Sequence, residues 1–218
     1  MSPASCRGSR RNNTHRPDSA EFVAAKKALA GISTETTAQA DGSQTQSEIR
    51  RLSTKEWGPA DRFTTYEHGA FLVDYPADWQ VTGDRNTALT IYPKGATSAE
   101  TVAYGTILSA FTPGRGGNNL EEATRHIVAS MRDTNPGLRQ AGNPVNISVN
   151  GRPAKSVELV GTSAVRENNQ PLPERIRLVA LQGKNGIVLY MVFIAPGPDF
   201  DSLRPVFDRI MRSFVLRD

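Results

Sequence analysis

The clearest pattern of apolar and polar residues lies in the C-terminal third of the chain. Apolar and polar residues alternate over much of residues 175–182, and residues 187–194 form a continuous apolar run, IVLYMVFI. The first pattern predicts a strand with one buried face, and the second a strand buried on both faces. A short turn, GKNG, joins the two. A strand of the second kind requires a covering layer on each side of its sheet.

Two amphipathic helices are predicted to provide those layers. One has Asn118 or Asn119 as its N-cap and runs to about Arg132, with two glutamates in the first turn, where the helix dipole favours acidic residues. The other follows Asp201 as N-cap, which puts Pro205 near the first turn, where its missing N–H costs little. Apolar residues recur at helical spacing in both: Leu120, Ala123, Ile127 and Met131, then Leu203, Val206, Phe207, Ile210 and Phe214.

Shorter strands are predicted earlier in the chain, over residues 63–66, 70–75, 88–92, 102–112, 145–149 and 153–160. Asn150-Gly151, between the last two, is typical of a two-residue hairpin turn. Residues 166–173 are predicted to form a polar loop, and Trp79 is expected to pack on the core. Consecutive hairpins with an inserted helix predict an α+β fold, with one mainly antiparallel sheet covered by helices.

The first 60 residues have a different composition. Residues 33–47 contain no apolar side chain larger than alanine, which is too little apolar surface to offset the entropy of ordering them. Only residues 18–30, DSAEFVAAKKALA, have the pattern of a helix. We therefore expect a largely disordered basic tail over residues 1–60, with this helix and a Ser/Thr/Gln-rich linker, and one domain over residues 61–218.

The positive net charge is concentrated in the tail. Residues 1–60 hold nine Lys and Arg against six Asp and Glu, whereas residues 61–218 hold seventeen against sixteen. A basic tail attracts polyanions non-specifically, but no basic stripe with interleaved aromatic residues follows it. The charge pattern therefore argues against specific nucleic-acid binding.

The compartment is predicted from the absence of targeting signals. No apolar segment precedes Cys6, the only cysteine, and no apolar run has the length of a membrane span. As written, the chain is expected to be cytoplasmic. A start codon upstream of Met1 that adds a signal peptide would instead place it in the cell envelope.

The motifs of common catalytic sites are absent from the sequence. A single cysteine excludes a disulfide framework, and the three histidines, His15, His68 and His126, form no HExxH pair. Neither a GxSxG elbow nor a phosphate-binding glycine loop occurs. Asp199 and Asp201 are interpreted as helix caps. The sequence therefore predicts no catalytic residue, no metal ligand and no cofactor.

One loop remains as a candidate binding site. Gly114, Arg115, Gly116 and Gly117 connect a predicted central strand to the start of a helix. Free N–H groups, the helix dipole and the guanidinium could together hold an anion, although the two glutamates of the first helical turn oppose this. The alternative is a flexible connection without a ligand.

Two sets of residues resemble a known family. Phe71-x-Val73-x-Tyr75-Pro76-x-x-Trp79 and Phe200-x-x-Leu203-x-Pro205-x-Phe207 are similar to packing motifs of PsbP-like domains. The resemblance covers most of the chain from Arg62 onwards and implies a PsbP-like α/β/α sandwich.

A narrower resemblance concerns residues 149–154, 169–175 and 200–207. They are similar to the domain at the C-terminus of some bacterial HExxH zinc metallopeptidases of the CAAX-processing type. In that family the zinc-binding helix lies upstream, so no zinc ligand is carried over onto this chain.

The sequence leaves two main functional hypotheses. The first is a non-catalytic accessory or binding module with a protein partner, associated with a peptidase. The second is the C-terminal part of a zinc endopeptidase whose catalytic domain is missing upstream. An enzyme of unrecognised type is a third, which the lack of paired polar groups disfavours.

Overall fold

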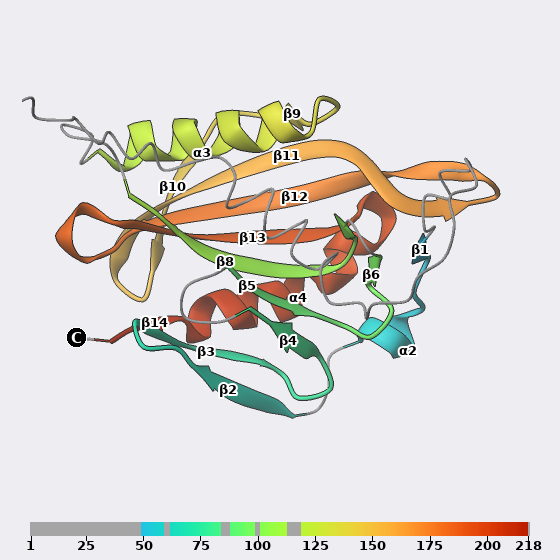
Figure 1. The fold of residues 1–218 in the computed structure, drawn as a ribbon, viewed down its shortest axis with the longest axis horizontal. Helices are drawn as coiled ribbons and strands as arrows, with labels where there is room; N and C mark the ends of the chain where they lie inside the picture. Colours follow the sequence, from blue (N-terminus) through green and yellow to red (C-terminus); the bar gives the residue numbers. More distant parts are fainter. Residues whose placement is uncertain (1–48, 59–61, 84–87, 99–100, 113–118, 218) are drawn as a thin grey trace, which may run out of the picture.

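The computed structural model describes residues 49–58, 62–83, 88–98, 101–112 and 119–217. Its main sheet has the strand order β1-β11-β12-β13-β8-β5-β4, and β9 and β10 also pair with β11 (Figure 1). All neighbours are antiparallel except β1, which is parallel to β11. The strands are β1 (Ile49–Arg50), β4 (Gln80–Thr82), β5 (Leu89–Tyr92), β8 (Gly105–Phe111), β9 (Arg139–Gln140), β10 (Val145–Val149), β11 (Arg152–Glu167), β12 (Gln170–Gln182) and β13 (Val188–Pro196).

The remaining elements lie outside the main sheet. A small sheet has the order β14-β3-β2, and β6 pairs with β7 in a separate ribbon. These elements are β2 (Phe63–Glu67), β3 (Phe71–Pro76), β6 (Thr97–Ser98), β7 (Thr101–Val102), β14 (Val215–Leu216), α2 (Thr54–Trp57), α3 (Leu120–Thr134), α4 (Gly197–Ser213) and a 3₁₀ turn over Lys184–Gly186.

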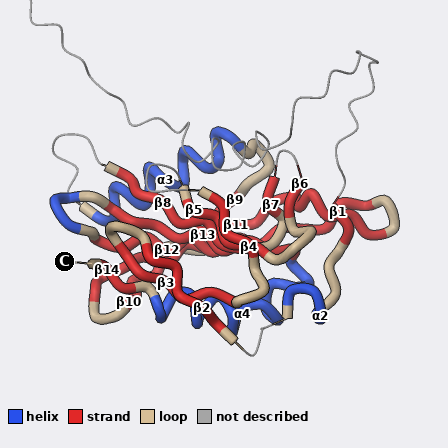
Figure 2. The backbone as a smooth tube through the Cα atoms, turned by 60° about the horizontal axis from the view of Figure 1, so that its bottom comes forward, coloured by secondary structure: helices blue, strands red, loops and turns tan. Residues whose placement is uncertain are grey.

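β13 is buried on both faces, as its apolar run predicts. Met191, Phe193 and Ala195 belong to one apolar cluster, and the alternate residues Val192 and Ile194 belong to another. α3 covers the second cluster, and α4 lies on the opposite side of the sheet with the small sheet beside it (Figure 2). The predicted α+β fold with a mainly antiparallel sheet covered by helices is confirmed.

Local signals in the sequence account for the turn between β10 and β11 and for the start of α3. Asn150 and Gly151 both have positive φ, 50° and 78°, as the predicted hairpin turn requires. The side chain of Asn119 accepts a hydrogen bond from the N–H of Glu121 at 2.8 Å and caps α3. Trp79 is only 5% exposed, so it packs on the core as expected.

The predicted polar loop over residues 166–173 is wrong. β11 continues to Glu167 and β12 begins at Gln170, so only two residues separate these strands. Asn168 and Asn169 have positive φ, 50° and 64°, and form a tight hairpin turn. Asparagine tolerates this left-handed conformation, which permits a turn without glycine.

The predicted start of the C-terminal helix is also wrong. α4 begins at Gly197, with proline in its first turn, and Pro205 lies inside the helix. Asp201 therefore does not cap it; its carboxylate pairs instead with Arg175 and Arg204. The apolar face of α4 is buried on both sides of Pro205, and this burial offsets the hydrogen bond that the proline removes.

A segment assigned to the tail packs against the core. Residues 49–57 contribute β1 and α2, and Ile49, Leu52 and Trp57 are at most 4% exposed. The folded core therefore includes residues on both sides of the boundary placed at residue 60. Residues 1–48, with the predicted helix and linker, lie outside the described part of the chain, so the disordered tail stays a prediction.

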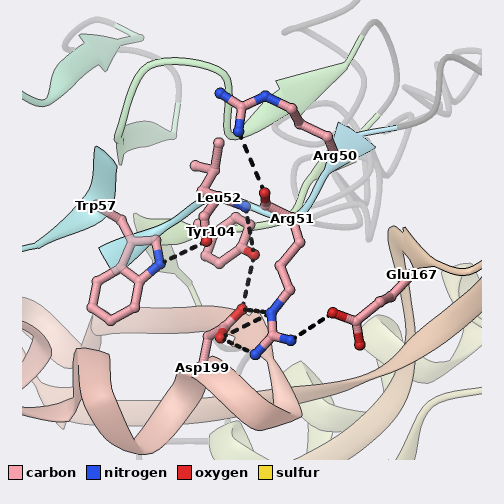
Figure 3. Close-up of polar contacts among 7 residues, drawn as sticks. All are labelled: Arg50, Arg51, Leu52, Trp57, Tyr104, Glu167 and Asp199. Atoms are coloured by element: carbon pink, nitrogen blue, oxygen red, sulfur yellow. Dashed lines mark hydrogen bonds and ion pairs between the residues drawn. The ribbon is translucent and has the colours of Figure 1, made fainter. Parts of the chain in front are cut away.

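Three side chains, Arg51, Tyr104 and Asp199, fasten this segment to α4, and we call them the clasp (Figure 3). Arg51 donates from Nε and Nη2 to the Asp199 carboxylate, the shortest contact being 2.6 Å. Tyr104 donates its hydroxyl proton to Asp199 at 2.9 Å and accepts the N–H of Leu52 at 3.2 Å. Arg51 also pairs with Glu167 at 2.8 Å.

The clasp satisfies a carboxylate that the fold has removed from water. Asp199 is 6% exposed and Tyr104 is fully buried. Burial raises the pKa of Tyr104 above its ordinary value of 10.0, and its hydrogen bond to Asp199 acts in the same direction. The two carboxylates raise the pKa of Arg51, which stays charged. Asp199 is buried but Arg51 is only partly so, with side-chain exposures of 8% and 33%, so loss of Arg51 removes the charged partner of a buried carboxylate.

Replacing Tyr104 by phenylalanine tests the clasp. We expect Tyr104→Phe to lower the free energy of unfolding by about 1–3 kcal/mol at neutral pH, because it leaves the buried Leu52 N–H without its acceptor. Chemical denaturation measures this difference. Tyr66→Phe, on β2, is the control and should change stability by no more than about 0.5 kcal/mol.

The free energies of unfolding of the wild type and of Tyr104→Phe should depend differently on pH. The sign of the difference follows from the raised pKa of Tyr104. Above about pH 10 the tyrosine ionises in the unfolded chain but keeps its proton in the folded one, so the wild type loses stability as the pH rises. Tyr104→Phe lacks this titration, and the stability gap should narrow between about pH 10 and about pH 11. A gap that stays constant over that interval contradicts the assignment.

Candidate functional site

The predicted anion-binding loop lies outside the described residues. This applies to Gly114, Arg115, Gly116 and Gly117, so anion binding there stays a prediction. At the described start of α3, Glu121 pairs with Lys155 at 2.5 Å, and this pair lowers the pKa of Glu121.

The structure describes two of the three histidines, His126 and His68, and shows what each contacts. His126 is exposed on α3, with its ring 6.2 Å from that of Phe111. His68 lies in the turn between β2 and β3, where Nδ1 accepts the N–H of Ala70 at 3.1 Å and the ring stacks on Phe71 at 4.4 Å. Within the described ranges, no three His, Cys, Asp or Glu residues gather as a metal site would require.

The clasp brings three ionisable side chains together, and these groups bind one another. Arg51 and Tyr104 both donate to Asp199, and the resulting network holds the segment 49–57. An open hollow beside it is lined by residues that include Arg51, Glu167 and Asp199, which are already paired. Sequence reasoning missed the clasp because Arg51 and Asp199 lie 148 residues apart.

A cavity of about 330 Å³ lies where the small sheet meets the end of the main sheet. Its walls come from the start of β3, from β14, and from β5, β8 and β13, and the turn between β12 and β13 closes one side. The apolar lining residues are Ala70, Phe71, Ala88, Leu89, Leu108, Ala110, Ile187, Leu189 and Leu216.

The floor of the cavity is set by strand register. Leu89 lies opposite Leu108 in the β5–β8 pair, and Ala110 lies opposite Leu189 in the β8–β13 pair. Leu108 is 3% exposed, but Ala110, two residues further on the same face, is exposed and Leu189 is half-buried. The small sheet therefore covers Leu108 and ends before Ala110, which leaves an apolar surface at the bottom of a recess.

The polar residues that line the cavity, among those that the structure describes, are His68, Ser109, Thr112, Lys184 and Arg217, and no described Asp or Glu lines it. Arg217 donates from Nη2 to Glu67 at 2.7 Å, and its side chain is 41% exposed. This ion pair leaves the guanidinium partly solvated at the edge of the recess.

Ser109 and His68 both line the cavity. Among the contacts of the described residues, no hydrogen bond joins Ser109 to His68, and the Nδ1 atom that could act as a base is engaged by Ala70. Ligand sites in proteins are typically apolar recesses of about 300–1,000 Å³ with a few polar groups, and this cavity meets that description. The sequence offered only a faint signal for it, the small residues Ser109 and Ala110 after Ile107 and Leu108 in the same strand.

No described helix is long and apolar enough to cross a membrane. No protein-family model and no curated protein matches the sequence.

Several solved structures are similar to this chain. The solution structure of cyanobacterial PsbP (CyanoP) from Synechocystis sp. PCC 6803 has a TM-score of 0.51 at 9% identity, over 71% of this chain and 92% of that one. The Ran-binding protein Mog1p of Saccharomyces cerevisiae has a TM-score of 0.48 at 10% identity, over 72% and 96%. LpqN of Mycobacterium tuberculosis, described as involved in cell envelope biogenesis, has a TM-score of 0.43 at 14% identity, over 72% and 91%. The similarity to CyanoP shows that this chain has a PsbP-like α+β fold.

Proposed function

We propose that this chain is a non-catalytic binding module whose ligand site is the cavity between the small sheet and the end of the main sheet. The observation that carries the proposal is the exposure of Ala110 at the floor of an apolar recess. An apolar floor that contacts water lacks the stabilisation that burial gives to apolar surface. A ligand that covers the floor buries this surface and thereby stabilises the folded chain.

The outer surface of the described chain does not favour a broad apolar interface, because few large apolar side chains are exposed there. Val145 and Val215 are the strongly exposed large apolar residues of the described chain, at 58% and 48%. They lie on different sheets, β10 and β14. The proposal includes a protein partner because of the accessory role. This partner would contact the chain mainly through polar groups.

The accessory role follows from the narrower resemblance. Residues 149–154, 169–175 and 200–207 are similar to a domain appended to HExxH metallopeptidases, which supports a module that assists a peptidase. The alternative is that this chain is the C-terminal part of such an enzyme. In both versions of the proposal, the cavity of this chain binds a ligand, and the peptidase reaction takes place in another domain.

A neutral fluorescent dye tests the cavity as a binding site. We expect N-phenylnaphthylamine to bind saturably, one molecule per chain, with enhanced emission, because the recess is apolar. Ala110→Phe should abolish this binding by filling the floor, while leaving the free energy of unfolding within about 0.5 kcal/mol of wild type.

The matched control is Ala141→Phe, which makes the same change at an exposed alanine outside the cavity. It should bind the dye as the wild type does. Dye binding that is absent, or equally strong in Ala110→Phe, is evidence against the proposed site.

The peptidase association has a separate test. If the chain is part of a metallopeptidase, the DNA immediately upstream of the Met1 codon encodes an in-frame HExxH motif; if it is a separate accessory module, it does not. Metal analysis of the purified chain should find no stoichiometric zinc in either case, because the zinc ligands of that family lie upstream. A stoichiometric zinc ion bound to this chain contradicts both versions.

A further inference from the structure

We infer that two copies of this chain pair through the outer edge of β10, in an antiparallel register centred on Ile147. The main sheets of the two copies then continue through the interface as one sheet. Residues 145–149 do not line the cavity, so this inference does not depend on the proposed ligand site. It rests on a strand edge whose backbone and sequence can pair with themselves.

β10 lies at an edge of the main sheet. Among the described residues, β11 is the only strand that pairs with β10, so no described strand lies along its other side. Natural proteins usually protect such an edge with charged side chains, proline or bulges. β10 has the sequence VNISV, which contains no proline and no charged residue. By contrast, Pro171 and Pro173 lie on the part of β12 that extends beyond its pairing with β13, where they cannot donate to an added strand.

The backbone groups of Asn146 and Ser148 are directed towards the open edge. In an antiparallel pair, opposed residues that exchange hydrogen bonds alternate with opposed residues that do not. Ser148 lies opposite Pro153, which has no N–H, so this pair is of the second kind. Asn146, opposite Lys155, is two positions away and is of the same kind. The N–H and C=O groups of both residues therefore point away from β11, where an added strand can bind them.

A second copy of β10 fits this edge. When two β10 strands pair antiparallel about Ile147, Asn146 of each lies opposite Ser148 of the other, so the outward backbone groups meet. Val145, which is 58% exposed, then lies opposite Val149 of the partner subunit, and the pairing reduces this exposure. Since no side chain of β10 is charged, the two-fold symmetry brings no like charges together along the strand.

The length of the edge limits the affinity of the dimer. β10 has five residues, and residues 141–144 separate it from β9. A pairing of this length buries less than the ~1,200 Å² typical of a stable interface. We therefore expect a weak, reversible dimer with a dissociation constant on the order of 100 µM.

Sedimentation equilibrium of the full chain, from about 10 µM to about 1 mM, measures this dissociation constant. Ser148→Pro removes an outward N–H from each copy and should weaken the dimer at least about fivefold. Ser148→Ala is the matched control, because it keeps the N–H and loses only the hydroxyl of an exposed residue. Its dissociation constant should stay within about twofold of the wild-type value.

Disulfide cross-linking tests the register. In a Cys6→Ser background, Ile147→Cys places two thiols across the two-fold axis, where Cα atoms about 4.5 Å apart permit a disulfide. Val145→Cys is the control: Val145 is more exposed than Ile147, but its two copies lie about 13 Å apart along the strands, too far for a disulfide. Mild oxidation should cross-link Ile147→Cys and leave Val145→Cys largely uncross-linked.

A concentration-dependent dimer that Ser148→Pro weakens and Ile147→Cys traps supports the inference. A chain that stays monomeric over the whole concentration range overturns it and leaves the edge to an extended segment of another protein. A dimer that Ser148→Pro leaves unchanged, or that Val145→Cys traps more efficiently than Ile147→Cys, has another interface and also overturns it. If the circular dichroism spectrum shows that Ser148→Pro does not fold, the two cysteine variants decide between these outcomes.

Discussion

β13 is buried on both faces along most of its length, and much of the fold follows from this constraint. Its residues alternate between two apolar clusters, with Phe193 and its same-face neighbours in one and Val192 and its neighbours in the other. Each cluster needs a covering layer. In the described structure, α3 and the following Leu138 cover one, whereas the other is covered by α4 and the small sheet together (Figure 2).

The cover formed by α4 and the small sheet explains where the cavity lies. α4 contacts β12, β13 and β3, and β3 extends the cover towards β8 and β5. β14, which closes the small sheet, has only two residues. The main sheet continues past this edge, so Ala110 and Leu189 lie beyond it. The recess is thus a consequence of unequal lengths in two stacked sheets, and it needs no unusual backbone conformation.

Features determined by neighbouring residues could be predicted from the sequence, and features determined by distant pairs could not. The turn at Asn150-Gly151, the cap at Asn119 and the double burial of β13 depend on local residue types. The place of residues 49–57 depends on Arg51 meeting Asp199. The turn at Asn168-Asn169 is local and was missed, because two asparagines in a polar stretch are equally typical of a loop.

The clasp and the proposed ligand site lie at two ends of the same sandwich. The clasp joins the start of α4 to β1 and β8 near Tyr104, where every buried polar group of the network is paired. The cavity lies at the other end of β8, around Ala110. β8 pairs with β5 as far as Leu108 and with β13 as far as Phe111, so one strand links the two ends. In the proposed binding module, the register of these pairs determines that Leu108 and Ala110 share the face that lines the cavity.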